Sequence, residues 1–280
     1  ANSSVQLTAN PVDAYGNPVA GTPITWSVEA GGGQITNAGL FTAFSQAGTF
    51  DNSVIASGGG VEQMVTVQVL PSAPNRLALT PNALNLVPQE EIQLALMVFD
   101  ANDNPIEPTN VIYSVASGEG YFTVSPTGLV RALSAAGSGS IQISANGLST
   151  SVNVEVVAGP ITQILVSRDI QNDPNPVEVQ ETLIVSPSEV IDLQAVALDA
   201  FENPVDVPLI WSTSVDGFGV NSAGVFTAGT VSGQYPNALR VRHLNIERLI
   251  NVEVLAGDPV ELHIEPSTIV ATPGSSQQLQ

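Results

Sequence analysis

The chain lacks two residue types altogether, because its 280 residues include no cysteine and no lysine. Without cysteine it can form no disulfide and no thiolate metal site. Without lysine it can form no isopeptide cross-link between a lysine and an asparagine or aspartate side chain. Each domain must therefore be held together by its packed core alone.

Basic residues are also scarce, since the chain has six arginines and 26 acidic residues, which gives a net charge of −20. This charge repels phosphates and anionic lipids, so we expect neither nucleic acid nor an anionic membrane as a partner. No apolar run reaches the ~20 residues of a membrane helix. No long segment shows helical periodicity, whereas short alternating runs rich in Val, Ile and Thr indicate strands.

The hexapeptide Asp-Ala-x-x-Asn-Pro occurs three times, at 13–18, 100–105 and 199–204. An alternating strand precedes each copy, and a strand with a central aromatic residue follows it. We predict that these aromatics are core residues, and they are Trp26, Tyr113 and Trp211. Each unit then has a strand that begins with glycine. The last strand of each unit is of the Val-x-Val type, at 65–70, 152–157 and 250–255.

About seven short strands per ~90 residues, with turn signals between them, are typical of an immunoglobulin-like sandwich. The order of these motifs resembles the bacterial Ig-like domains of surface proteins such as invasin and intimin, over essentially the whole chain. The resemblance implies an all-β fold class, namely tandem immunoglobulin-like β-sandwiches. The linkers between them, at 70–74, 157–160 and 255–259, are short and contain proline, which predicts that the sandwiches are arranged as an elongated rod. The resemblance also implies an extracellular location at a cell surface.

The repeats predict four parts of the chain. Residues 1–71 form an Ig-like domain that lacks its first strand, and 72–158 a complete one. Residues 159–256 form a complete domain with an insertion at 167–178, and 257–280 provide the first strand and the start of a further domain. Two interpretations remain open: a piece of a longer array, or donor-strand exchange, in which the tail of one molecule completes the open first domain of the next.

The repeated hexapeptide predicts a structural turn at the end of a strand. Its Asp has inward parity and can accept N–H bonds from the turn, its Asn tolerates a left-handed conformation, and its Pro needs no ladder partner. The turn residues are Asp13, Asn17, Pro18, Asp100, Asn104, Pro105, Asp199, Asn203 and Pro204.

Calcium is the alternative use of such oxygen-rich segments. Asp100, Asn102 and Asp103 cluster in the second copy, and Asp169 and Asp173 lie in the insertion. The insertion matches no loop of defined ligand spacing, which favours a solvated loop there, with a calcium site or a lateral contact as the alternatives. No cofactor other than calcium is expected.

Three arginines of the third domain suggest an interaction surface. Arg240 and Arg242 share one face of a strand, and Arg248 lies across a predicted hairpin. A positive patch on so acidic a molecule could dock another copy of the chain. The alternative is that these arginines pair with Glu247 and Glu253 at little net gain.

The sequence contains no nucleophile elbow, P-loop or paired-carboxylate signature, so we do not expect an enzyme. We expect a structural or adhesive segment of an extracellular stalk or filament, which presents or links other parts at a prokaryotic cell surface. Flanking Ig-like domains or other copies would be its partners. The alternatives are a surface-layer, pilus-like (strand-donating) or phage-particle filament component, or a module that binds a surface glycan or receptor.

Overall fold

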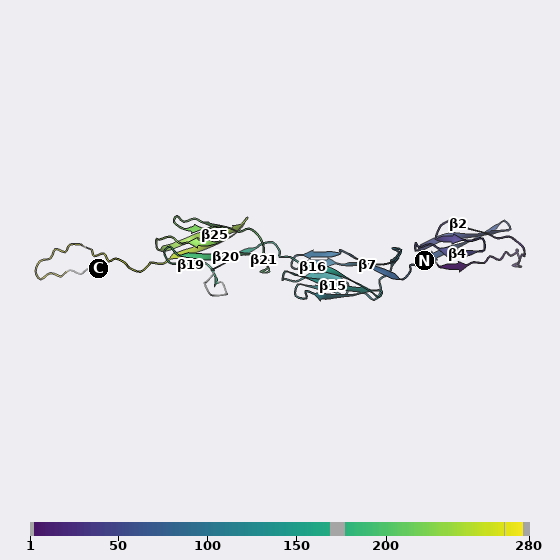
Figure 1. Ribbon diagram of the computed structural model, residues 1–280, viewed down its shortest axis with the longest axis horizontal. Coiled ribbons are helices and arrows are strands. Elements are labelled where there is room, and N and C mark those ends of the chain that lie inside the picture. Colours follow the sequence, from purple (N-terminus) through teal and green to yellow (C-terminus); the bar gives the residue numbers. More distant parts are fainter. Residues whose placement is uncertain (1–2, 169–176, 266, 277–280) are drawn as a thin grey trace. The chain divides into compact units, whose positions relative to one another are not determined.

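The computed structural model describes residues 3–168, 177–265 and 267–276, and every regular element within these ranges is a β-strand. The chain divides into two compact units, Ala1–Val157 and Ala158–Gln280 (Figure 1). Among the described residues, no helix is long and apolar enough to cross a membrane. The all-β class of immunoglobulin-like sandwiches predicted from the sequence is therefore confirmed.

The first repeat is a small sandwich in the first unit, with three strands in each sheet, in the orders β1-β4-β3 and β2-β5-β6. Its strands are β1 (Ser4–Gln6), β2 (Thr25–Val28), β3 (Gly33–Ile35), β4 (Leu40–Ala43), β5 (Gly48–Gly58) and β6 (Val61–Val69). Its core gathers Phe41, Val54 and Val69, and Trp26 packs against them while remaining partly exposed. This core is the smallest of the three, because one strand position of the sandwich is not filled.

The second repeat completes the first unit, and in its own sandwich the corresponding strand position is filled by β8. Its main sheet has the order β12-β15-β16-β8, and two three-stranded sheets, β11-β10-β7 and β13-β14-β9, lie with it. Its strands are β7 (Pro74–Thr80), β8 (Ala83–Leu86), β9 (Glu91–Gln93), β10 (Ala95–Asp100), β11 (Pro105–Ile106), β12 (Ile112–Ser117), β13 (Phe122–Val124), β14 (Leu129–Ala132), β15 (Gly137–Ala145) and β16 (Leu148–Val156). Because side chains alternate along a strand, Val152, Val154 and Val156 of β16 all point into the core.

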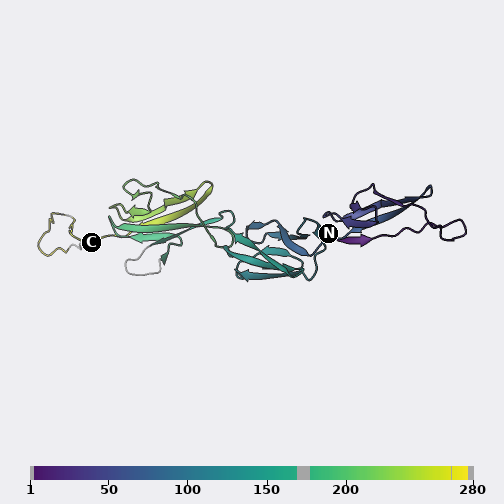
Figure 2. The ribbon, with the colours of Figure 1, turned by 45° about the vertical axis from the view of Figure 1, so that its right-hand side comes forward.

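The third repeat lies in the second unit and is again a β-sandwich, here of two sheets, as a turned view of the ribbon shows (Figure 2). The sheet orders are β18-β17-β20-β24-β23, with β21 on β20, and β19-β26-β25-β22. Its strands are β17 (Gln163–Arg168), β18 (Val177–Glu178), β19 (Thr182–Val185), β20 (Val190–Leu198), β21 (Pro204–Val205), β22 (Ile210–Thr213), β23 (Gly219–Val220), β24 (Val225–Thr227), β25 (Gly233–His243) and β26 (Ile246–Val254). The pair β17–β18 joins the two ends of the predicted insertion 167–178, with Ser167 opposite Glu178 and Arg168 opposite Val177.

A parallel strand pair closes the main sheet of the second and third repeats. Strand β8 pairs in parallel with the end of β16, and β19 pairs in parallel with the end of β26. All other strand pairs among the described residues are antiparallel. In the first repeat, β6 has no such parallel neighbour among the residues that the structure describes.

The further domain predicted after β26 stays a prediction. Between residues 257 and 276, the described positions form no strand, although a first strand was predicted there. The apolar side chains of this segment are exposed, for example Val260 at 99% and Leu262 at 89%. A strand needs a neighbour to satisfy its backbone groups, and the described residues provide none here.

Candidate functional site

The Asp-Ala-x-x-Asn-Pro segments form one turn with the same internal hydrogen bonds in every copy. In the second copy, Asp100 Oδ1 accepts the backbone N–H groups of Asn102 at 2.8 Å and of Asn104 at 2.9 Å. Asp100 Oδ2 accepts the side-chain amide of Asn104 at 2.8 Å. The N–H bonds that the sequence predicts for this aspartate are therefore present. Within the turn, Oδ1 accepts the backbone N–H groups and Oδ2 accepts the side-chain amide.

The first and third copies repeat this arrangement. Asp13 accepts the N–H groups of Tyr15 and Asn17, both at 2.9 Å. Asp199 accepts those of Phe201 at 2.8 Å and Asn203 at 2.9 Å. In both copies Oδ2 accepts the asparagine side-chain amide, at 3.1 and 3.0 Å. The varied middle residues donate only backbone groups, so their side chains are free to differ.

One detail of the predicted turn is wrong. The residue with a left-handed conformation is not the asparagine but the residue before it, with φ of 84° at Gly16, 61° at Asp103 and 66° at Glu202. The asparagine is instead required for its side-chain amide, which both donates and accepts.

In the second copy, this turn also joins two repeats, and we call residues 100–105 the junction turn. Asn104 donates from Nδ2 to the backbone oxygen of Ser45 at 2.7 Å. Its Oδ1 accepts the N–H of Ala47, also at 2.7 Å. One amide side chain thus bonds to two backbone groups of the first repeat while it remains bonded to its own Asp100.

The linker between the two repeats is held by the same aspartate. Ser72 donates its backbone N–H to Asp100 Oδ2 at 2.8 Å and its hydroxyl to the same oxygen at 2.9 Å. In the third repeat, Gly159 of the preceding linker donates its N–H to Asp199 Oδ2 at 2.7 Å. The aspartate therefore fixes the chain that enters the repeat, at two of the three copies.

Burial separates these two copies from the first. Asp100 and Asp199 are each 1% exposed, and Asn104 is 5% exposed. Asp13 and Asn17 are exposed, and among the described residues Asp13 bonds only to groups of its own turn. The same sequence motif is thus a solvated turn in one place and a buried junction in another.

The buried carboxylates stay ionised because their hydrogen bonds outweigh their burial. Burial alone raises the pKa of Asp100. The hydrogen bonds donated by Asn104, Ser72 and Asn102 lower the pKa by more than burial raises it, so that it lies well below its usual range. For Asp199, burial is again the largest single effect and raises the pKa, whereas bonds from Asn203, Gly159 and Phe201 lower it to about 2. Asp100 and Asp199 are therefore both charged at neutral pH.

The calcium ligands proposed from the sequence are engaged otherwise in the second copy. Both oxygens of Asp100 accept hydrogen bonds, and Asp103 Oδ1 pairs with Arg76 at 2.8 Å. Among the described residues, no three His, Cys, Asp or Glu side chains gather as a metal site. Asp169 and Asp173 lie outside the described residues, so calcium there stays a prediction.

The three arginines do not share one face. Arg240 pairs with Glu247 at 3.5 Å, whereas Arg248 stands opposite the fully buried Val241 in the register of β25 and β26. Directly opposed residues of a sheet point to the same side, so Arg248 points inward. It donates to the backbone oxygens of Val179 and Gln180. The patch of Arg240, Arg242 and Arg248 predicted from the sequence is therefore not formed.

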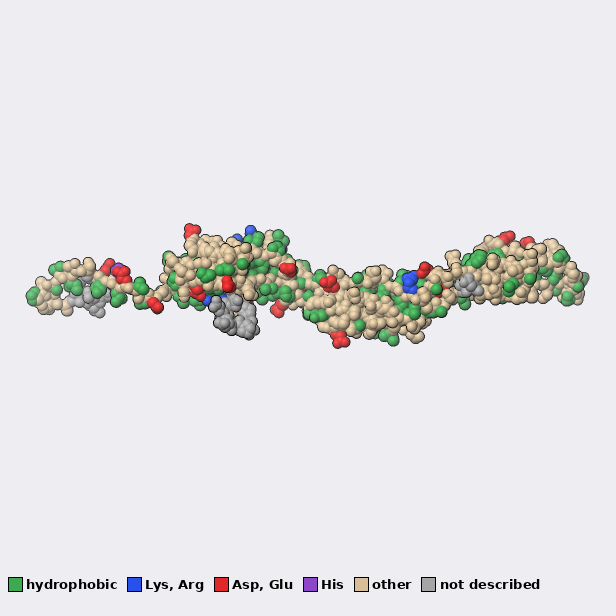
Figure 3. All heavy atoms as spheres, in the orientation of Figure 1, with side chains coloured by type: hydrophobic (Ala, Val, Ile, Leu, Met, Phe, Trp, Pro, Cys, Tyr) green, Lys and Arg blue, Asp and Glu red, His purple; other side chains and the backbone are tan. Residues whose placement is uncertain are grey.

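Acidic side chains are scattered rather than gathered on the face drawn in Figure 3. The predicted core aromatics Trp26, Tyr113 and Trp211 are partly buried and pack against the cores of their repeats. The bonds to Ser45, Ala47 and Ser72 could not be found from the sequence, because most of them involve backbone groups that no motif marks.

No protein-family model matches the chain, and no curated protein matches it. Among solved structures, the Escherichia coli adhesin FdeC matches at 18% identity and a TM-score of 0.46, over 87% of this chain and 90% of that one. Domains 4–9 of surface layer protein SbsC match at 19% identity and a TM-score of 0.31, over 91% of this chain and 43% of theirs. Extracellular cadherin domains 1–4 of protocadherin gamma B7 match at 12% identity and a TM-score of 0.43, over 84% and 67%. These likenesses assign no function.

Proposed function

We propose that the chain is a structural segment of an extracellular stalk or filament at a prokaryotic cell surface, and that its junction turn, residues 100–105, fixes the second Ig-like repeat to the first. The observation that carries this proposal is the Asn104 side chain. Within one buried amide it joins its own repeat, through Asp100, to the backbone of the preceding repeat at Ser45 and Ala47.

The mechanism is geometric. A linker by itself leaves the angle between two domains free, unless contacts across the joint restrict it. Two hydrogen bonds from one planar amide restrict both bending and twisting, because the amide is itself held by Asp100. The bonds of Ser72 to that carboxylate fix the linker at the same point. The joint therefore transmits orientation from one repeat to the next.

The composition supports the same role. A net charge of −20 keeps copies apart in solution and disfavours binding to nucleic acid. The buried charges of the junction are satisfied by hydrogen bonds, which is the condition for keeping them there without a large loss of stability.

The test measures the width of the distance distribution between the first two repeats. Because the chain has no cysteine, Asp51→Cys and Ser149→Cys place two spin labels at unique, exposed sites in β5 and β16. We expect a narrow distribution by double electron–electron resonance and a broader one after Asn104→Ala.

Asn102→Ala is the matched control, since Asn102 uses only its backbone N–H in the turn. It should leave the distribution narrow. Equal widths for the parent chain, Asn104→Ala and Asn102→Ala would show that the turn does not hold the joint, and the proposed mechanism would fail.

A further inference from the structure

Three side chains form a cluster beside the junction turn, and their contacts are separate from the bonds of Asp100 and Asn104. Arg76 of β7 donates from Nη2 to Asp103 Oδ1 at 2.8 Å. Its guanidinium carbon also lies 4.3 Å from the centre of the Phe99 ring in β10. We call Arg76, Phe99 and Asp103 the arginine cluster. Among the residues that the structure describes, this cluster contains the one ion pair that reaches the junction turn.

The sheet itself places Arg76 beside the turn. In the register of β7 and β10, Arg76 lies directly opposite Phe99, which immediately precedes the turn residue Asp100. Directly opposed residues point to the same side of a sheet, so the guanidinium and the ring lie on one face. A cation over an aromatic face is attracted to it, and Phe99 is half-buried, which restricts the ring. The arginine is therefore oriented by the strands and the ring as well as by Asp103.

Asp103 is the residue of the turn that most needs support. Its φ of 61° lies in the left-handed region, which residues other than glycine seldom adopt. Its backbone N–H reaches the oxygen of Asp100 at 3.3 Å, whereas that of Gly16 in the first copy reaches the oxygen of Asp13 at 3.0 Å. A distance of 3.3 Å is beyond the usual range of such bonds. The bond from Arg76 therefore holds the turn where its own backbone bond is weakest.

The position of Asp103 matters because Asn104 follows it directly. The Asn104 amide bonds to the backbone of Ser45 and Ala47 in the first repeat. A change in the backbone at Asp103 redirects this amide, since the two residues share a peptide bond. Arg76 thus acts on the joint through Asp103 and touches neither residue of the first repeat in its own hydrogen bonds.

The third repeat has the same turn without the cluster. The counterpart of Arg76 is Gln163, which lies opposite Leu198, the residue before Asp199. This position therefore has neither a cation nor an aromatic ring. Glu202 takes the left-handed place with φ of 66° and forms no ion pair among the described residues. The turn forms without such a cluster, so the cluster is an addition to the second copy.

We propose that Arg76 is a positioning residue of the junction turn, and that its bond to Asp103 makes the alignment of the first two repeats depend on ionic strength. This role rests on the proposed function and adds a regulator to it. The side chains of Arg76 and Asp103 are 47% and 79% exposed, so dissolved salt screens their attraction. Asn104 is buried, and its bonds are screened much less. Salt therefore loosens the support of the turn while the turn itself remains.

The first test measures hydrogen exchange of the Asn104 backbone N–H by NMR, because this group donates to Asp100 Oδ1 inside the turn. The salt concentration is raised from about 0.01 M to about 1 M NaCl, over which the Debye length falls from about 30 Å to about 3 Å. We expect exchange to become about two- to fivefold faster, the range that an exposed ion pair contributes. The N–H of Asn203 is the reference within the same molecule. It makes the same bond to Asp199 without a cluster, so its exchange should not respond in this way.

Variants separate the charge of the cluster from other effects of salt. Arg76→Gln should give fast exchange at Asn104 at both salt concentrations, and Arg76→Lys should restore part of the salt dependence because it keeps the charge. Arg131→Gln is the matched control, since it removes the same charge from the same repeat at an exposed pair with Glu91. It should behave as the parent chain. Equal exchange in Arg76→Gln and Arg131→Gln, or a salt response at Asn203 as large as at Asn104, would overturn the proposal.

The second test asks whether the cluster acts on the alignment of the repeats. It uses the chain with spin labels at Asp51→Cys and Ser149→Cys. The distance distribution should be narrow at low salt and broader at high salt, and with Arg76→Gln it should be broad at both. If Asn104→Ala leaves the distribution narrow, the proposed function fails. If Asn104→Ala broadens it at low salt whereas Arg76→Gln does not, the role of Arg76 fails and the proposed function stands.

Discussion

Asn104→Ala should destabilise the first repeat, although Asn104 belongs to the second. The substitution removes two hydrogen bonds to the first repeat, at Ser45 and Ala47, both 2.7 Å long. Each such bond contributes about 0.5–1.5 kcal/mol net, so the free energy of unfolding of the first repeat should fall by about 1–3 kcal/mol. With a urea dependence of about 1–1.5 kcal/mol/M for so small a domain, the midpoint should fall by roughly 0.7–3 M.

The chain offers a clean reporter for this measurement. It has two tryptophans, Trp26 in the first repeat and Trp211 in the third. In a Trp211→Tyr background, which copies the residue at position 113, fluorescence reports the first repeat alone. Asn102→Ala is the control, because its side chain is exposed and makes no bond across the joint. If Asn104→Ala leaves the Trp26 midpoint where Asn102→Ala leaves it, the reasoning is refuted.

Three further outcomes follow from individual residues. The pKa of Asp199 is lowered to about 2 in the fold, below its unfolded value of about 3.9, so the stability that this carboxylate contributes is complete above about pH 5 and is lost as the pH falls toward 2. The free energy of unfolding of the third repeat should therefore fall less steeply with decreasing pH in Asp199→Asn than in the parent chain. An equal slope in the two chains would contradict the assignment. Gly128→Ala should cost about 1–3 kcal/mol, because φ is 84° there and a Cβ would lie 2.8 Å from the ring of Tyr113. Gly147→Ala, with φ of 80° and open space, should cost less in the same calorimetric scan. Arg248→Ala removes the hydrogen bonds to the backbone oxygens of Val179 and Gln180, so it should lower the stability of the third repeat by about 1–3 kcal/mol. It should not change self-association measured by light scattering. A change in association without a change in stability would show that Arg248 belongs to a docking surface.

The strands were predictable because alternation of apolar residues reports burial directly. The Val-x-Val runs at 65–70, 152–157 and 250–255 are the ends of β6, β16 and β26, as expected. Alternation does not report which strands are neighbours, so the parallel pairs β8–β16 and β19–β26 could not be read from it. Neighbour choice depends on how distant segments pack together.

The turn was predictable in part for a similar reason. The repeated aspartate and asparagine mark its internal bonds, which follow from the chemistry of those two side chains. The left-handed position was missed, because Gly16, Asp103 and Glu202 share no residue type. The arginine patch was wrong because the register of β25 and β26 places Arg248 opposite the inward-facing Val241, and spacing along one strand does not predict that register.

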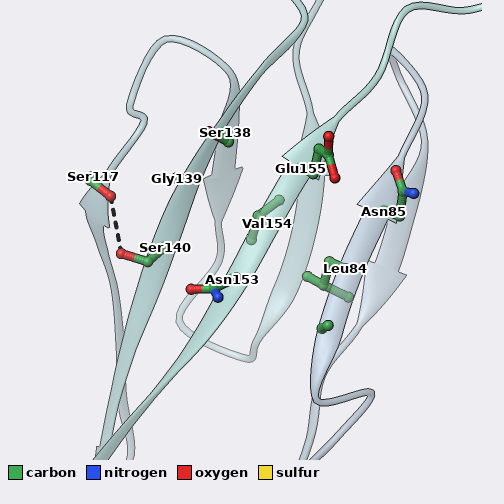
Figure 4. Close-up of a pocket in the computed structure, with 10 residues that line it drawn as sticks. Leu84, Asn85, Ser117, Ser138, Gly139, Ser140, Asn153, Val154 and Glu155 are labelled. Atoms are coloured by element: carbon green, nitrogen blue, oxygen red, sulfur yellow. Dashed lines mark hydrogen bonds between the residues drawn. The ribbon is translucent and has the colours of Figure 1, made fainter.

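The parallel pair in each complete repeat has a mechanical consequence. The chain enters the second repeat through β7, continues into β8 and leaves the repeat at the end of β16, and β8 and β16 are neighbours that run in the same direction (Figure 4). A force that stretches the chain therefore pulls them along each other, so that their hydrogen bonds are loaded together rather than broken one by one. Among the described residues, this parallel arrangement is present in the second and third repeats, where β8 and β19 carry the load against β16 and β26.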